Sequence, residues 1–147
     1  MELAFEYVIG AGLEREGDYS YSGLDGTCGY DASKVAANIS SYVVVTPQSP
    51  DQLRAAIAHG PVSVAIQANK LVFQLYTSGV ITSTKCGTNL DHGVTAVGYG
   101  TDAVSGDYFL VKNSWGNTWG EAGYVRIGAV DGDGICGIQE DPSYPVV

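Results

Sequence analysis

The chain has 147 residues, of which 45% are apolar, and it carries a formal net charge of −9 at neutral pH. This length and apolar content suffice for one domain with a buried core and exclude a disordered chain. The negative charge argues against nucleic acid or an anionic membrane as a partner, and the sequence has no apolar run long enough to cross a bilayer.

The first predicted element is a helix near the N-terminus, because residues 2–9 carry apolar side chains at helical spacing. Gly10 and Gly12 are suited to end that helix. Residues 17–28 are rich in Gly, Tyr and Asp and are predicted to form an irregular loop. A strand is then expected over residues 35–46.

The second predicted helix has a strong start signal. Ser49 can cap it, Pro50 fits the first helical position, and Gln52 completes a capping box. Gly60 is expected to end the helix. His59 then lies in the last turn, where we assign it to the helix end rather than to catalysis.

The next segment, residues 61–68, alternates in polarity and predicts a strand. A short helical turn is expected over residues 69–76, and extended pieces over residues 80–82 and 124–127. Residues 131–134 resemble part of a calcium loop, but the rest of that pattern is absent, so we predict a turn.

Two further strands are predicted to form an antiparallel hairpin that carries the candidate chemistry. The first begins at His92 and the second leads into Asn113, with a Gly-rich connection over residues 100–106. If Gly98 lies opposite Asp107, then His92 lies opposite Asn113. Directly opposed residues have Cβ atoms about 4.5–5.5 Å apart, so this register predicts contact between imidazole and carboxamide.

A His–Asn pair has a specific chemical use. The amide oxygen of Asn113 can accept a hydrogen bond from one ring N–H of His92, which fixes the tautomer and orientation of the ring. The other ring nitrogen can then take or share a proton with a nucleophile. A neutral orienting group suits a thiolate–imidazolium pair, because the thiolate already balances the charge on the ring. Trp115 is expected to shield the pair from water.

The segments around these residues resemble the His and Asn blocks of the papain-like cysteine peptidases, in particular the cathepsin L-like members. The resemblance runs over essentially the whole chain, in order and spacing. The segments that carry it are Leu90-Asp91-His92-Gly93-Val94, Val111-Lys112-Asn113-Ser114-Trp115-Gly116, Trp119-Gly120-Glu121-Ala122-Gly123-Tyr124, Gly60-Pro61-Val62-Ser63-Val64-Ala65-Ile66, Phe73-Gln74-Leu75-Tyr76, Cys136-Gly137-Ile138 and Ser143-Tyr144-Pro145.

The resemblance implies an α+β papain-like fold, mainly the antiparallel β-barrel-like lobe with short helices, and a helical lobe that is largely missing. Residues 1–147 are expected to be a single partial peptidase domain, its C-terminal two-thirds. In this family the catalytic Cys precedes the His and Asn by about 130–150 residues, which puts it about 40–60 residues before Met1. The missing N-terminal lobe, of the same enzyme or a separate chain, is therefore an expected partner, and the isolated chain is expected to be inactive.

The same resemblance implies roles for individual residues. His92 is the base, Asn113 orients it, and Trp115 shields their bond. Four residues are implied to line the pocket for the second substrate side chain before the scissile bond, namely Ala65, Leu90, Gly93 and Asp141. An acidic residue at the position of Asp141 lets that pocket accept Arg as well as apolar side chains, through a charge-assisted hydrogen bond. The alternatives are core packing for the first three and a solvated surface carboxylate for Asp141.

The chain has three cysteines. The resemblance pairs Cys86 with Cys136 and places the partner of Cys28 in the missing segment. Such bridges imply an oxidising compartment, and we expect a lysosomal, vacuolar or extracellular location. The alternatives are three unrelated buried thiols, or metal binding by Cys86, His92 and Cys136, whose spacing fits no common zinc pattern. No metal or organic cofactor is expected.

Two functions from different classes compete. The first is a cysteine peptidase acting on peptide or protein substrates, to which this chain supplies the base, its orienter and part of the cleft. The second is a catalytically dead papain-like module with a structural or protein-binding role. The residue encoded about 40–60 positions upstream separates them, since Cys supports the peptidase and Ser or Gly supports the module.

Overall fold

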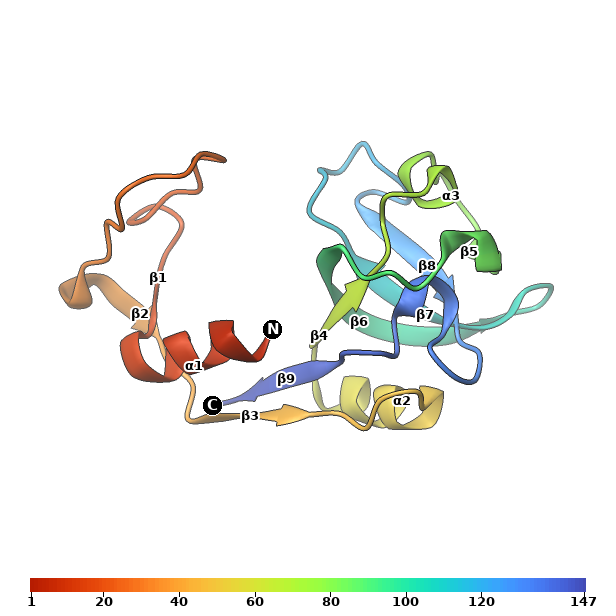
Figure 1. The fold of residues 1–147 in the computed structure, drawn as a ribbon, viewed down its shortest axis with the longest axis horizontal. Helices are drawn as coiled ribbons and strands as arrows, with labels where there is room; N and C mark the ends of the chain where they lie inside the picture. The colour runs from red at the N-terminus through yellow and green to blue at the C-terminus, as the bar shows by residue number, and fades with distance from the viewer. The chain divides into compact units, whose positions relative to one another are not determined.

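The computed structural model describes all 147 residues and divides them into two compact units. The smaller unit comprises Met1–Val43 with Pro145–Val147, and the larger unit comprises Val44–Tyr144. Figure 1 colours most of the smaller unit red to orange and the larger one yellow to blue. No helix combines the length and the apolar character needed to cross a bilayer. The expectation of a single partial domain stays a prediction.

The smaller unit is built from one helix, a two-stranded sheet and long irregular segments. Its elements are α1 (Glu2–Ala11), β1 (Leu13–Glu14), the 3-10 helix η1 (Ala32–Lys34), β2 (Val35–Ala37) and β3 (Ser41–Val44), whose last residue belongs to the larger unit. The predicted helix and the predicted loop over residues 17–28 are both confirmed. The helix ends at Gly12, where φ is 80° and a Cβ would lie 2.5 Å from Cγ1 of Val35. Glycine is required there by both backbone conformation and space.

The prediction of one continuous strand over residues 35–46 is wrong, because the chain bends between β2 and β3. In the bend, Oδ1 of Asn38 accepts a hydrogen bond from the N–H of Ile39 at 2.8 Å. The N–H of Ser40 donates to the carbonyl of Val146 at 2.7 Å. The first bond is local and competes with a regular strand ladder, whereas the second ties the bend to a residue 106 positions away.

The larger unit is a sheet with short helices. Its elements are α2 (Pro50–His59), β4 (Val62–Ile66), α3 (Leu71–Gln74), β5 (Val80–Ile81), the 3-10 helix η2 (Thr84–Cys86), β6 (His92–Asp102), β7 (Gly106–Lys112), β8 (Tyr124–Gly128), the 3-10 helix η3 (Ile135–Gly137) and β9 (Ser143–Val146), whose last two residues belong to the smaller unit. The strands follow the order β9-β4-β6-β7-β8-β5, antiparallel except for the parallel pair β5 and β8. The α+β class is therefore as expected.

Helix α2 has the predicted ends. The hydroxyl of Ser49 accepts a hydrogen bond from the N–H of Gln52 at 3.3 Å, and Pro50 occupies the first turn. The helix ends at Gly60, so His59 lies in the last turn. Its apolar stripe is buried in the unit, through Leu53, Ala56 and Ile57.

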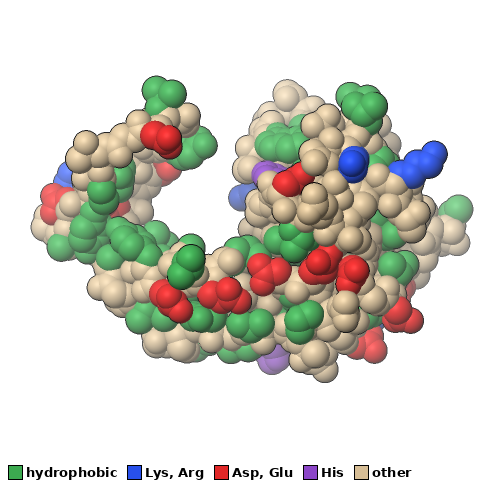
Figure 2. Space-filling model, in the orientation of Figure 1, with side chains coloured by type: hydrophobic (Ala, Val, Ile, Leu, Met, Phe, Trp, Pro, Cys, Tyr) green, Lys and Arg blue, Asp and Glu red, His purple; other side chains and the backbone are tan.

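The core of the larger unit lies on one face of its sheet. Along β4, Val62, Val64 and Ile66 are fully buried and alternate with half-buried residues, as the period of two predicted. They join buried apolar residues from β7 and β8, namely Phe109, Val111, Val125 and Ile127. On the face drawn in Figure 2, acidic side chains are seen more often than basic ones, in keeping with the net charge of −9.

The predicted β6–β7 hairpin is present, but its predicted register is wrong. Gly98 pairs with Leu110, and Asp107 pairs with Thr101. The strands run two residues beyond Gly100, because Oδ1 of Asp102 accepts hydrogen bonds from the backbone N–H groups of the turn. The ladder also shifts register between Ala96 and Gly98. His92 is therefore not opposite Asn113 in the sheet.

Candidate active site

His92 is the first residue of β6 and sits at the junction of two strands. It pairs across the sheet with Ile66, the last residue of β4. The approach to His92 is fixed by Asp91, whose N–H donates to the carbonyl of Ile66 at 3.0 Å and whose Oδ1 accepts from the N–H of Ala68 at 2.7 Å. The imidazole is thus held half-buried at the end of the sheet.

The structure brings His92 and Asn113 into contact although their strands do not align them. Nε2 of His92 lies 2.9 Å from Oδ1 of Asn113. Asn113 follows the last residue of β7 and is only 7% exposed. Its N–H donates to the carbonyl of Gly123 at 3.0 Å, so the backbone beyond the strand is held in place. The pair forms across the end of the hairpin rather than within its ladder.

The tautomer of His92 follows from a second bond to the same oxygen. The backbone N–H of Ser114 donates to Oδ1 of Asn113 at 2.8 Å. A backbone N–H is always a donor, so the amide atom that faces both groups is the oxygen. Nε2 of His92 must therefore carry the proton of this bond. In the neutral ring, Nδ1 is left as the nitrogen that can accept a proton from a nucleophile.

Trp115 covers one side of this pair. Its ring centroid lies 5.3 Å from that of His92, with 31° between the planes. The indole also meets Phe73 and Trp119 edge to face, at 5.4 Å and 5.3 Å. It remains 40% exposed. Aromatic contact on several sides gives the indole a defined position beside the imidazole.

A hollow in the surface lies next to His92. It is lined by Ala68, Asn69, Gln74, Asp91, His92 and Trp115. Ala68 and Asn69 were not singled out by the sequence analysis, and Gln74 was named only within the segment Phe73-Gln74-Leu75-Tyr76, without a role in the site. Ala68 and Asn69 reach the site because the pairing of β4 with β6 brings the end of β4 to the start of β6. Gln74 is the last residue of α3, and its carbonyl accepts a hydrogen bond from Nε1–H of Trp119.

The predicted pocket residues lie on three segments of the larger unit. Ala65 pairs directly with Gly93 across β4 and β6, and a Cβ added at Gly93 would meet no atom within 4 Å. Leu90 precedes β6 and packs against Gly137, where an added Cβ would lie 2.7 Å from Cδ2 of Leu90. Asp141 is half-buried on the segment between η3 and β9. The pairing of Ala65 with Gly93 leaves space at Gly93, and the apolar side chain of Leu90 is close by in the sequence.

Glu140 is a titratable residue that the sequence analysis did not assign to the site. One of its carboxylate oxygens, Oε1, is buried and has no hydrogen-bond partner. Burial, and secondarily the charge of Asp133, raises the pKa of the Glu140 carboxyl above its usual 4.5. An added Cβ at Gly137 would lie 2.7 Å both from this oxygen and from Leu90 Cδ2. The carboxyl of Glu140 and the side chain of Leu90 therefore both lie beside Gly137.

The sulfur atoms of the larger unit are joined. Cys86 in η2 and Cys136 in η3 form a disulfide, with Cα atoms 4.9 Å apart. The metal alternative is thereby overturned, because a disulfide leaves these two residues no thiolate to bind an ion. The chain has no cluster of three or more His, Cys, Asp or Glu side chains suited to hold a metal. Cys28, in the smaller unit, keeps an exposed thiol.

Comparison with known protein sequences shows that the chain is similar to described cysteine peptidases. A sequence profile described as papain family cysteine protease matches residues 1–146. Cysteine proteinase RD21A from Arabidopsis thaliana is 46% identical over 150 residues, which cover 99% of this chain and 32% of that protein. Cathepsin L from Sarcophaga peregrina is 43% identical over 150 residues, with 100% of this chain and 44% of that protein covered. The chain thus spans less than half the length of these curated relatives.

Solved structures agree with the sequences. The bromelain protease from Ananas comosus, in complex with the E64 inhibitor, superposes with a TM-score of 0.91 at 40% identity, covering 99% of this chain and 68% of that one. Digestive procathepsin L2 from Tenebrio molitor larval midgut gives a TM-score of 0.92 at 41% identity, covering 100% and 47%. The predicted papain-like fold is therefore confirmed.

Proposed function

Because the chain belongs to the papain family of cysteine proteases, we propose that it is the part of a cysteine peptidase that supplies the base, its orienting amide and one wall of the substrate cleft. The observation that carries the proposal is the bond between His92 Nε2 and Asn113 Oδ1, held by the N–H of Ser114. This bond leaves Nδ1 of His92 to face a nucleophile.

The proposed reaction uses a thiol from outside these residues. Cys86 and Cys136 are joined in a disulfide, so neither offers a thiol to His92. Nδ1 of His92 takes the thiol proton, and the thiolate attacks the carbonyl carbon of the peptide bond. The imidazolium then gives its Nδ1 proton to the leaving amine as the carbon–nitrogen bond breaks. Water afterwards hydrolyses the thioester with His92 acting again as base. The N-terminal lobe, in the same or another chain, is the proposed source of the thiol.

Asn113 and Trp115 support this cycle without exchanging protons. Asn113 accepts from Nε2 in both the neutral and the protonated ring, so the imidazole keeps its direction throughout. Trp115 keeps water from one side of the bond, as its 5.3 Å ring contact with His92 suggests. The hollow beside His92 and Trp115 is the proposed place for the leaving part of the substrate.

A chimera tests the proposal. The segment that precedes the matched region in Arabidopsis thaliana cysteine proteinase RD21A would be joined to this chain, and hydrolysis of a fluorogenic Phe-Arg peptide would be measured. The chimera is expected to hydrolyse the peptide and to be blocked by E64, whereas the chain alone should not. His92→Ala in the chimera should lower kcat/KM by about 10²–10⁴-fold, the range for a general base.

The matched control is His59→Ala, since His59 is exposed in the last turn of α2. This variant should hydrolyse the peptide at the parental rate. Equal rates for His92→Ala and its parent would contradict the base assignment. A folded chimera whose thiol reacts with E64 but which hydrolyses nothing would favour the alternative, a catalytically dead module with a structural or protein-binding role.

Ala65, Leu90, Gly93 and Asp141 are the proposed lining of the pocket for the second residue before the scissile bond. In the chimera, Asp141→Ser is expected to lower hydrolysis of an Arg-Arg substrate about tenfold more than that of a Phe-Arg substrate, because a charge-assisted hydrogen bond to guanidinium is lost. Asp131→Ser is the control, since Asp131 is an exposed carboxylate in the same unit. An equal loss on both substrates would rule out a role for Asp141 in selectivity.

We place the complete protein in a lysosomal, vacuolar or extracellular compartment. The disulfide between Cys86 and Cys136 supports this proposal, because such bridges persist in oxidising surroundings. Attachment of a fluorescent protein to the native gene product and imaging in its own cells would test it, and a uniformly cytosolic signal would contradict it.

A further inference from the structure

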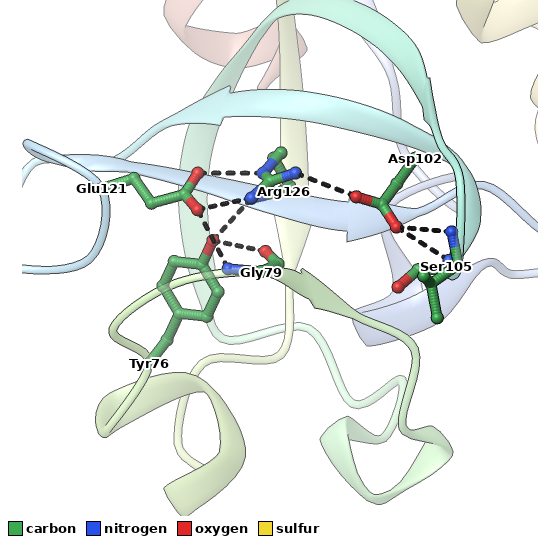
Figure 3. A network of polar contacts seen from close by, with 7 residues as sticks. Tyr76, Gly79, Asp102, Ser105, Glu121 and Arg126 are labelled. Atoms are coloured by element: carbon green, nitrogen blue, oxygen red, sulfur yellow. Dashed lines mark hydrogen bonds and ion pairs between the residues drawn. The ribbon is translucent and has the colours of Figure 1, made fainter.

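A network of polar contacts lies at the far end of the loop that carries Asn113 and Trp115, and Figure 3 shows its members. The loop connects β7 to β8 over residues 113–123. It begins with Asn113 and Trp115 at the site and ends with Trp119 and Glu121. Contacts that hold Glu121 at the end of the loop therefore also constrain Asn113 and Trp115 at its beginning.

Glu121 is the centre of the network. Its two carboxylate oxygens accept from Arg126 of β8, Oε1 from Nη2 at 2.7 Å and Oε2 from Nε at 3.0 Å. Oε1 also accepts from the backbone N–H of Gly79 at 2.9 Å. These bonds tie the end of the loop both to β8 and to the segment that precedes β5. Figure 3 shows the three groups converging on this carboxylate.

Tyr76 links the network to the indoles. Its hydroxyl donates to the carbonyl of Gly79 at 2.6 Å and accepts from the N–H of Arg126 at 3.4 Å. Its ring lies 5.6 Å from the ring of Trp119. The loop backbone also rests on this ring, since a Cβ added at Gly120 would lie 3.0 Å from Cδ1 of Tyr76. The tyrosine is thus bonded at its hydroxyl and packed at its face.

Trp119 completes the connection to the site. Its Nε1–H donates to the carbonyl of Gln74 at 3.1 Å, and its ring meets Trp115 at 5.3 Å. Trp115 in turn covers His92. Contacts therefore run from Glu121 through Gly79 and Arg126 to the hydroxyl of Tyr76. From the ring of Tyr76 they continue through Trp119 to Trp115. The hydrogen bonds from Arg126 hold the pKa of the Glu121 carboxyl below its usual value, so the ion pair persists to lower pH than an ordinary glutamate would allow.

We propose that Glu121 is a positioning residue for the His92–Asn113 pair. Through Gly79 and Arg126 it fixes Tyr76, whose contact with Trp119 holds Trp115 beside the bond of the pair. The catalytic value of this role rests on the proposed function. The position of Trp115 beside His92 is a property of this chain alone and can be measured in it. Arg126 also pairs with Asp102 at 3.5 Å and lies over the ring of Tyr108 at 5.4 Å. Asp102 is the last residue of β6, so it shares the arginine with Glu121 from outside the loop over residues 113–123.

The test measures exchange of the His92 Nε2–H proton with water, by NMR on the 147-residue chain. Glu121→Ala is expected to speed this exchange about tenfold. The reason is the loss of charge-assisted hydrogen bonds that keep Trp115 over the bond between His92 and Asn113. Asp102→Asn is the matched control, because it removes the other carboxylate charge beside Arg126 while an amide oxygen can still accept in the turn. Its exchange rate should stay within about twofold of the parent.

Two results would overturn the proposal. One is an unchanged exchange rate in Glu121→Ala, and the other is equal acceleration in Asp102→Asn, which would indicate a general loosening of the unit. If Glu121→Ala does not fold, Glu121→Gln decides by the same readout, with a smaller rise expected. The measurement needs no thiol and no substrate, so its failure is distinct from a failure of the chimera to hydrolyse peptides.

Discussion

Oδ1 of Asn113 receives two hydrogen bonds, one from the ring of His92 and one from the backbone of Ser114. The second bond determines what the first one does, because it fixes which amide atom faces the imidazole. An aspartate at this position would accept both bonds as well, but it would add a negative charge. The neutral amide orients the ring, and in the proposed reaction it leaves the charge on the ring to be balanced by a thiolate.

Glu140 gives a prediction for single residues that concerns stability. Its pKa is raised by burial, so the folded chain holds the proton to a higher pH than the unfolded chain does. The stability from this group is complete below pH 4.5, the ordinary pKa, and is lost as pH rises through the raised value. Glu140→Gln should therefore raise Tm at pH 7, by roughly 2 °C, and leave it unchanged at pH 4.

Thermal unfolding followed by circular dichroism at both pH values measures this difference. Asp131→Asn serves as the control, because Asp131 is exposed and should show no such pH dependence. A lower Tm for Glu140→Gln at pH 7, or the same rise at pH 4, would contradict the buried, unpartnered carboxyl.

At this scale the sequence predicted the important contact for a partly wrong reason. The meeting of His92 with Asn113 is present, yet the register that led to it is not. The two side chains meet because Asn113 lies beyond the end of β7, where the backbone is free of the ladder. Glu140 was out of reach of sequence reasoning, because nothing in its neighbours along the chain shows that Oε1 is buried.

Among the elements, the two long helices were the most predictable. α1 and α2 have glycines directly after their last residues, and α2 also has a capping serine. These signals are local, so they can be read from a few neighbouring residues. The hairpin was less predictable, because its register depends on how Asp102 folds the turn and on a shift near Gly98. The break between β2 and β3 depends on Val146, more than 100 residues away, as the bond between Ser40 and Val146 shows.

Helix α2 supplies a prediction for an element. Ser49→Ala removes the hydroxyl that accepts from the N–H of Gln52 and leaves that donor without its partner. We expect the free energy of unfolding to fall by about 1 kcal/mol, the usual value for an N-cap. Ser78→Ala is the matched control, because Ser78 is exposed and lies outside any helix or strand. Urea unfolding that gives the same midpoint for both variants would contradict the capping role.

The molecule as a whole consists of two units of unequal size, and the candidate site lies in the larger one. All residues that bond to or cover His92 come from Val44–Tyr144, so this unit holds the complete base and its lid. The relatives are more than twice as long as the matched region. The proposed division of labour is therefore between a base built here and a thiol supplied by another segment.

The disulfide gives a prediction at this scale. Cys86 and Cys136 are 50 residues apart in the sequence, and a loop of that length contributes ~4 kcal/mol in the chain-entropy account. Replacing both by Ala should lower the free energy of unfolding of the larger unit by about this amount. Both tryptophans lie in that unit, so their fluorescence during urea unfolding reports on it directly.

Cys28→Ser is the control for this measurement, since its thiol is exposed and belongs to the other unit. It should leave the fluorescence transition where it is. A double variant that unfolds at the parental urea concentration would show that the bridge does not hold the larger unit together.

The two bridged cysteines are 0% and 1% exposed. The thiol enzyme proposed here would need a reducing solution, whereas the bridge of this chain is an oxidised pair of sulfurs. Burial makes a reduced thiol and an intact disulfide compatible in one protein. A soluble reductant reaches a sulfur at the surface of a cleft long before it reaches one enclosed in the protein. Dithiothreitol at the concentrations used to activate a catalytic cysteine should therefore leave the structural bridge untouched, until the unit itself opens.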